Sequence, residues 1–284
     1  MSGMARYRFA SLRPAVLLAP AGLLIGLLGV CGLLILRLSL GERNAEWSSW
    51  SLSAYATLAE RYYLVIVLDT LWLALLSAVI TVIVAFPIAL YMTRTPSPLM
   101  RRAVLVCVML PMVVSLLVQS FGWMAILGPE GLLNQALALL TGRERAVSLL
   151  FNRTGVLLGL VQTTIPLAVL PTAAALAAIP IEFEEAASEL GASRLTAYRT
   201  IILPLAWPGI AAGCVLVFGF NTGAFVVPLL LGGLKVTTIA VLIRNEMGPS
   251  LNWPLGAALS VVLVTLALGI QALNRLGGAQ GRRT

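Results

Sequence analysis

Residues 182–191 read EFEEAASELG, within the longer stretch 180–204, PIEFEEAASELGASRLTAYRTIILP. Four of the chain's eleven acidic residues fall in this segment, although the chain is 60% hydrophobic and only 11% charged. A helix over 181–190 turns by about 100° per residue, which gathers one set of side chains within an arc of about 60° and a second set beside it. The first set is Glu182, Glu185 and Glu189, and the second is Phe183, Ala186, Ala187 and Leu190.

Capping residues mark the two ends of this amphipathic helix and predict a second helix after it. Pro180 suits the first turn of a helix, and Gly191 is placed to end the helix in a left-handed conformation. Ser193 would cap a second helix. Pro204 and Pro208 are expected to stop that second helix. The segment therefore predicts a helix–turn–helix.

A helical hairpin of this size has too few apolar residues to form a core of its own, so its apolar arc needs a cover. The alternatives are a solvated loop or a helix on the lipid surface. Lipid contact is disfavoured because anionic headgroups repel aligned acids, and interfacial helices usually carry Lys and Arg. The pattern favours docking to a cytoplasmic partner that pairs basic groups with the acids.

The rest of the chain has the composition of a membrane protein. Its mean hydropathy is +0.98, and its charged fraction of 11% compares with roughly 25% in soluble domains. Because a run of about 20 apolar residues spans a bilayer, the expected fold class is an all-α membrane protein with six transmembrane helices. The candidate spans are 14–36, 64–92, 103–127, 155–178, 208–232 and 254–273. The first is longer than the apolar core of a signal peptide, which favours a retained anchor over a cleaved leader.

The basic residues indicate the orientation. With the N-terminus inside, eleven of the nineteen Lys and Arg residues face the cytoplasm and eight face outward. The bias is clearest in TRTPSPLMRR (93–102) and at the termini. Both termini and the segment 180–204 are therefore predicted to be cytoplasmic. The net charge of +8 is assigned to these loops, and binding to nucleic acid is not expected.

Residues that support catalysis or metal binding are absent or isolated. The chain has no His, which excludes a Ser/His or Cys/His catalytic arrangement. Cys31, Cys107 and Cys214 each lie alone in an apolar run, without metal-ligand or disulfide spacing. The single Lys, Lys235, lies in GGLKVTT and not in a phosphate-binding loop. The chain is therefore not expected to be an enzyme or to hydrolyse ATP itself, and no metal or cofactor is expected.

Asp69 is the one acid placed within a span and is the first candidate for contact with a solute. It would attract a cation, with Trp72 three residues later offering an aromatic face. Alternatively, Asp69 lies at the membrane interface and caps the second span. Four other polar or aromatic side chains at pathway depth either contact solute or cross-link helices, namely Gln119, Trp123, Gln162 and Asn221.

Smaller patterns concern packing. Glycines spaced four apart at 22–26, 155–159 and 209–213 permit helices to approach closely. The segments 131–140 and 236–247 are predicted to form short helices at the outer surface.

The spacing within 180–204 also matches a known signature. From Glu185 the chain reads EAA, three residues, Gly191, nine residues, Ile201, one residue, Leu203 and Pro204. This resembles the EAA–x3–G–x9–I–x–LP motif of permease subunits in binding-protein-dependent ABC importers. Further segments resemble the spermidine/putrescine-type branch of that family, namely FPIALYMTR (86–94), LPMVVSLLVQSFGWMAILGPEGLLN (110–134), AFVVPLLLGG (224–233) and NWPLGAALSVVL (252–263).

The resemblance, which covers roughly 65–275, implies a type I ABC importer permease fold with a cytoplasmic coupling helix. The implied organisation is an anchor span with its outer loop at 1–63, a five-span core at 64–275 and a tail at 276–284. The motif would dock in a cleft of a cytoplasmic ATPase through Glu185, Ala186, Ala187, Glu189, Gly191, Leu203 and Pro204. The implied partners are an ATP-binding cassette ATPase dimer, a second homologous permease, an extracytoplasmic solute-binding protein and membrane lipid.

The resemblance implies a polyamine such as spermidine or putrescine as solute. Members with this pattern also carry thiamine, ferric ion, organophosphonates or opine-like amino acids. The chain departs from the branch at Asp69, where Asn is more usual, and at Val227, where Thr often precedes the Pro. A different class, the ion-coupled secondary transporter, usually places several ionisable groups near the midplane. This sequence offers at most one, and it also lacks the clustered carboxylates of a membrane enzyme.

Overall fold

The computed structural model of the chain describes residues 14–43, 49–141 and 149–280, so the basic start at 1–13 and the last residues of the tail lie outside the described residues. Within these ranges the regular elements are helices and no strand occurs. In chain order they are α1 (Pro14–Ser39), α2 (Ser53–Leu58), α3 (Arg61–Arg94), α4 (Pro98–Val113), α5 (Leu116–Leu127), α6 (Leu132–Thr141), α7 (Arg153–Ala177), α8 (Glu182–Glu189), α9 (Arg194–Ala197), the π-helical turn η1 (Tyr198–Ile202), α10 (Leu203–Thr222), the π-helical turn η2 (Pro228–Gly232), α11 (Ile239–Met247) and α12 (Trp253–Gln280).

The predicted number of six spans is confirmed, although the third lies at Leu116–Leu140 and not at the predicted 103–127. Among the described residues, six helical stretches are long and apolar enough to cross a membrane: Ala19–Ser39, Arg61–Arg94, Leu116–Leu140, Arg153–Ala177, Arg194–Thr222 and Trp253–Ile270. The short helices predicted at 131–140 and 236–247 are present as α6 and α11. Helix α12 continues through Gln280, into the segment predicted as a tail.

Helices α3, α7 and α10 pack together as the core of the bundle. One face of α3 carries a stripe of small buried residues, namely Ala74, Ala78, Thr81, Ala85 and Ala89. Lipid tails are as apolar as leucine, so helices in a membrane associate through close van der Waals contact and polar bonds rather than through hydrophobic burial. One such polar contact joins α3 to α7, where the Thr81 and Thr164 hydroxyl oxygens lie 3.4 Å apart.

Glycines bring α7 and α10 into close contact, as the spacing at 209–213 predicts. A Cβ added at Gly209 would collide with Ala175 and would lie 2.6 Å from the Pro171 carbonyl oxygen. Gly159 of the 155–159 pair packs against η2, where an added Cβ would lie 2.6 Å from Leu231 Cδ1. The glycines at 22–26 in α1 face open space, so they bring no helices of this chain together.

Two predicted spans are each interrupted. The span predicted at 103–127 comprises α4 and α5, which are separated at Val114 and Ser115. The span predicted at 208–232 ends as a helix at Thr222, and η2 begins only at Pro228. Apolar composition predicts where chain crosses lipid, but it does not report where helical hydrogen bonding stops.

The predicted stop after the second short helix is wrong. Ser193 caps α9 through the Thr196 N–H, as expected, but the chain stays helical from α9 to Thr222 through Pro204 and Pro208. In the turn before Pro204, the Leu203 N–H donates to the Tyr198 carbonyl, which lies five positions earlier. Proline ordinarily clashes with the carbonyl four positions back. The wider π-helical turn makes room there, so the helix continues.

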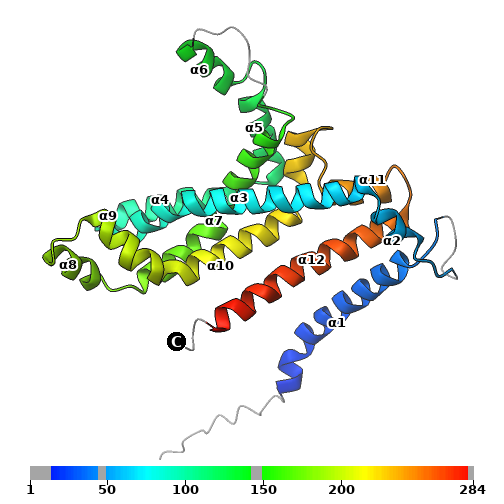
Figure 1. The fold of residues 1–284 in the computed structure, drawn as a ribbon, viewed down its shortest axis with the longest axis horizontal. Helices are drawn as coiled ribbons and strands as arrows, with labels where there is room; N and C mark the ends of the chain where they lie inside the picture. The colour runs from blue at the N-terminus through cyan, green and yellow to red at the C-terminus, as the bar shows by residue number, and fades with distance from the viewer. Residues whose placement is uncertain (1–13, 44–48, 142–148, 281–284) are drawn as a thin grey trace, which may run out of the picture.

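The long helices place different elements at the two ends of the bundle (Figure 1): α8 and α9 lie at one end, and α2 and α11 lie at the other. Helix α3 has 34 residues, about 51 Å at 1.5 Å per residue. It is therefore longer than the roughly 30 Å hydrocarbon core, and its last turn reaches the end that carries α8. Helix α1 packs on α12, and none of its membrane-spanning window is buried within the chain.

Candidate functional site

The segment predicted to dock a partner has the predicted local structure. Helix α8 ends at Glu189, and Gly191 follows with φ of +80°. The Gly191 N–H donates to the Ser188 carbonyl over 3.0 Å, and the Ala192 N–H donates to the Ala187 carbonyl over 3.0 Å. These two bonds define a Schellman ending, which requires the left-handed residue between them. The predicted role of Gly191 in the turn is confirmed.

Helix α8 presents an amphipathic surface that this chain does not cover. Ala187 is its one buried side chain. Phe183 is 49% exposed, and Leu190, which follows the helix, is 89% exposed. The acids at 182, 185 and 189 are exposed as well, and so is Ala186. Apolar side chains beside three free carboxylates at the end of a membrane bundle form a surface suited to a partner with basic groups.

Glu184 departs from the other acids of α8. Its Oε1 accepts a hydrogen bond from Arg94 Nε over 2.7 Å, and the two side chains are only 18% and 17% exposed. The Arg94 Nη2 donates to the Ile179 carbonyl over 3.1 Å. Arg94 is the last residue of α3, and Ile179 lies just beyond α7, so one guanidinium connects three elements. This contact is not predictable from the sequence, because the partners are 90 and 85 positions apart.

Leu203 and Pro204, the last residues carried over from the motif, do not lie in the α8–α9 turn. They begin α10 within the continuous helix, and both are exposed. They face outward from the helix that follows the turn.

The charge of Asp69 is already paired. Asp69 Oδ2 accepts a hydrogen bond from Arg153 Nη2 over 2.6 Å, with side chains that are 43% and 62% exposed. Asp69 lies inside α3, whose N-cap is Glu60, so the alternative in which Asp69 caps the span is wrong. A small pocket beside the pair is lined by Asp69, Trp72, Leu73, Arg153, Lys235, Val236, Thr237 and Thr238. It holds two cationic side chains against one acid.

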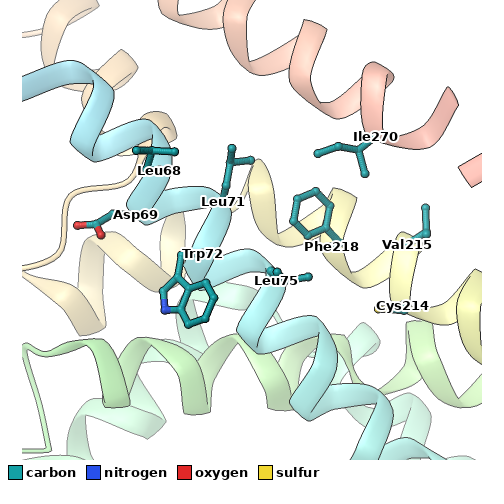
Figure 2. Close-up of a pocket in the computed structure, with 9 residues that line it drawn as sticks. All are labelled: Leu68, Asp69, Leu71, Trp72, Leu75, Cys214, Val215, Phe218 and Ile270. Carbon is teal, nitrogen blue, oxygen red and sulfur yellow. The ribbon is translucent and has the colours of Figure 1, made fainter. Parts of the chain in front are cut away.

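Asp69 and Trp72 also line a larger cavity of about 670 Å³ between α3, α10 and α12. Figure 2 shows Leu71, Phe218 and Ile270 turned toward one another across it, whereas the Asp69 carboxylate points away from them. The remaining lining residues are Leu68, Leu75, Cys214 and Val215. The wall is therefore apolar, and Asp69 contributes only at its edge.

Three of the four other predicted pathway residues cross-link helices. Trp123 Nε1 donates to Gln162 Oε1 over 3.2 Å and joins α5 to α7. Asn221, which is 3% exposed, donates to Ser77 Oγ over 2.8 Å and joins α10 to α3. In each case the polar side chain has a protein partner. Asn221 is buried in the helix interface rather than open to a pathway.

Gln119, the fourth, stabilises the interruption between α4 and α5. Its Nε2 donates to the carbonyls of Pro111 and Val114 over 2.6 and 2.7 Å. The last carbonyls of a helix have no partner within the helix, and at membrane depth each unpaired group is costly. Gln119 therefore permits a helix end where the sequence predicted a continuous span.

The two interruptions meet at a pocket that the sequence did not predict. A cavity of about 370 Å³ is lined by Leu116 at the start of α5, by Leu160 and Thr163 of α7, by Phe220 of α10 and by residues 223–227 after α10. Interrupted helices expose backbone groups near the midplane, which is where transporters commonly place their pathways. The available signal was Gly223 followed by Pro228, which interrupts an otherwise helical run.

Comparison with protein families adds to this geometry. The family described as "Binding-protein-dependent transport system inner membrane component" matches residues 81–276. The spermidine/putrescine transport system permease protein PotB of Salmonella typhimurium (strain SL1344) is 31% identical over 224 residues, which are 79% of this chain and 77% of the relative. PotB of Haemophilus influenzae is 33% identical over 212 residues, 75% of this chain and 74% of the relative.

A solved structure shares the fold. The crystal structure of a bacterial alginate ABC transporter in complex with an alginate pentasaccharide-bound periplasmic protein contains a chain that superposes with a TM-score of 0.70. The match covers 92% of this chain and 95% of that chain at 20% identity. At that identity the likeness concerns the fold alone.

Proposed function

This chain belongs to the family of binding-protein-dependent transport system inner membrane components and is a permease subunit of an ABC importer, and we propose that it carries a polyamine such as spermidine or putrescine. The support for the solute is the similarity to PotB over three quarters or more of the chain. The surface of α8 supports the further proposal that ATP hydrolysis is supplied by a separate cytoplasmic ATPase dimer.

The observation that carries the coupling proposal is the uncovered face of α8. Phe183 and Leu190 remain exposed beside free carboxylates. They lie at the bundle end that also carries the basic segment 93–102, between the end of α3 and the start of α4. Basic loops face the cytoplasm. An ATPase that binds this face would favour one of two conformations of the bundle. Its nucleotide state would then shift the population between the two conformations.

A second permease subunit and an extracytoplasmic binding protein complete the proposed complex. The face of α1 that α12 does not cover is available to lipid or to a second permease. We place the pathway along the side of the bundle where the α4–α5 and α10–η2 interruptions meet, with the pocket near Phe220 and Thr163 open to solute.

The pairing of Asp69 with Arg153 is compatible with a cationic solute. An exposed ion pair contributes only about 0–1 kcal/mol, so an ammonium group of a polyamine can exchange with the guanidinium. The same pocket holds Arg153 and Lys235, which favours one alternative, an anionic solute such as an organophosphonate.

Transport in proteoliposomes that contain the complete complex tests the proposal. ATP-dependent uptake of labelled spermidine or putrescine is the expected result, and phosphonate uptake without polyamine uptake would support the alternative solute. Glu185→Lys should abolish uptake and weaken ATPase association while membrane insertion stays normal. Normal uptake by that variant would contradict the coupling role of α8.

The orientation has its own test. Ser188 is exposed on α8, so Ser188→Cys in a background without the three native cysteines should resist a membrane-impermeant thiol reagent in intact cells. The same cysteine should react in inverted membrane vesicles. Labelling in intact cells would place α8 outside the cytoplasm and end the coupling proposal.

A further inference from the structure

We propose that Arg94 is the positioning residue that makes α8 move together with α3 and α7. The inference rests on the proposed function of α8 as the ATPase contact. It adds the joint through which a displacement of α8 reaches the membrane-spanning helices.

The geometry of the joint is specific to one side chain. Arg94 Nε donates to Glu184 Oε1 over 2.7 Å, and Arg94 Nη2 donates to the Ile179 carbonyl over 3.1 Å. The guanidinium is planar and directs several N–H donors along fixed directions. Arg94 can therefore hold the acid of α8 and the backbone beyond α7 at the same time.

The Arg94–Glu184 contact is mostly buried, unlike the other acidic side chains of α8. Both side chains of the pair are more than four-fifths buried, whereas the acids at 182, 185 and 189 are exposed. Within the part of the chain that the structure describes, this is the one ion pair between α8 and a membrane-spanning helix. Ala187 is the one buried side chain of α8, so apolar packing adds little to the attachment.

Short connections flank α8 on both sides. Pro180 and Ile181 precede the helix, and the left-handed Gly191 follows it. These connections tie α8 to α7 and α9, and the Arg94–Glu184 pair ties it to α3. A charge-assisted, mostly buried pair resists separation more than an exposed one does, so the Arg94–Glu184 contact is the element that transmits the displacement.

The decisive measurement is the ratio of solute imported to ATP hydrolysed, in the complete complex in proteoliposomes. Arg94→Ala and Glu184→Gln should lower this ratio by about fivefold or more, as expected for the loss of an energetic coupling between two sites, while the ATPase still copurifies. A purely structural defect would lower transport and hydrolysis in proportion and leave the ratio unchanged, and that result would overturn the proposal.

Matched variants sharpen the test. Arg94→Lys keeps a charge for Glu184 but cannot reproduce the second hydrogen bond in the same geometry, so its ratio should be intermediate. The exchange R94E/E184R should recover part of the ratio lost by either single change. Arg102→Ala, at an exposed position in the first turns of α4, should leave the ratio at the wild-type value. Equal ratios in the Arg102 and Arg94 variants would contradict the joint.

A second readout does not depend on the solute. Hydrogen exchange at the α8 amides should be faster in the Arg94→Ala complex than in wild type, and unchanged exchange would contradict the attachment. Absence of ATP-driven uptake by the wild-type complex would instead refute the proposed function. The two failures are therefore distinguishable.

Discussion

Gly191→Ala should weaken the association between this subunit and its ATPase through backbone strain alone. Gly191 has φ of +80°, and a Cβ added there meets no atom within 4 Å. The substitution therefore creates no clash within the chain. An L-residue in the left-handed region costs about 1–2 kcal/mol, which corresponds to roughly a 5–30-fold change in an equilibrium constant.

The strain acts on the end of α8. The turn either keeps its shape at that cost or opens, which breaks the Schellman bonds to Ser188 and Ala187 and changes the direction of the helix. Either way the binding-competent conformation is less populated, and the apparent affinity falls by up to the same factor. Asn tolerates the left-handed region better than Ala does, so Gly191→Asn should lie between wild type and Gly191→Ala.

Titration of the nanodisc-embedded permease pair with purified ATPase measures this affinity directly. Gly22→Ala is a matched control, because Gly22 also faces open space but lies in helical backbone of α1, and its affinity should equal that of wild type. Wild-type affinity in Gly191→Ala would refute the strain argument. If Asn and Ala weakened binding equally, contact of the new side chain with the ATPase would be the better explanation.

Two other substitutions test the pathway and the packing. Asp69→Asn should raise the half-saturation concentration for a cationic solute by about twofold to fivefold, the range of an exposed ion pair, without changing complex assembly; an unchanged value would show that Asp69 does not contact the solute. Gly209→Ala should destabilise the bundle by about 1–3 kcal/mol, because its Cβ would lie 2.6 Å from the Pro171 carbonyl oxygen. A thermal unfolding midpoint equal to that of Gly22→Ala would contradict the second expectation.

The sequence predicts the helices of this chain better than their interruptions. Apolar runs predict which segments cross the membrane, since lipid contact is averaged over some twenty residues. The interruption at Val114 depends on two carbonyls that accept hydrogen bonds from Gln119, a local arrangement that no hydropathy average contains. Pro204 shows the converse: the π-helical turn η1 lets the helix continue past a residue that normally ends one.

The local structure of 180–204 was predictable because its determinants are neighbours in sequence. Gly191 and Ser193 each act on backbone groups within five residues. The charge pairs were not predictable, because Asp69 and Arg153 are 84 positions apart. For the same reason Asp69 looked like a free acid in the sequence, and the structure shows its charge paired.

Three polar contacts along α3 and α7 favour movement of the two helices as one unit. Helices α3 and α7 run in the same direction and are joined near one end by Asp69 and Arg153, in the middle by the hydroxyls of Thr81 and Thr164, and at the other end through Arg94. Asp69 and Arg94 are 25 residues apart in α3, about 37 Å at 1.5 Å per residue. The stripe of small buried residues on α3 leaves little room for α3 to slide on α7.

A displacement applied to Glu184 should then move the pocket beside Asp69 along with it, so loss of Arg94 should make the environment of Asp69 insensitive to ATP. An environment-sensitive fluorophore at Thr237→Cys, which lines that pocket, should lose its ATP-dependent signal in Arg94→Ala, and a full signal in that variant would show that the displacement travels by another route.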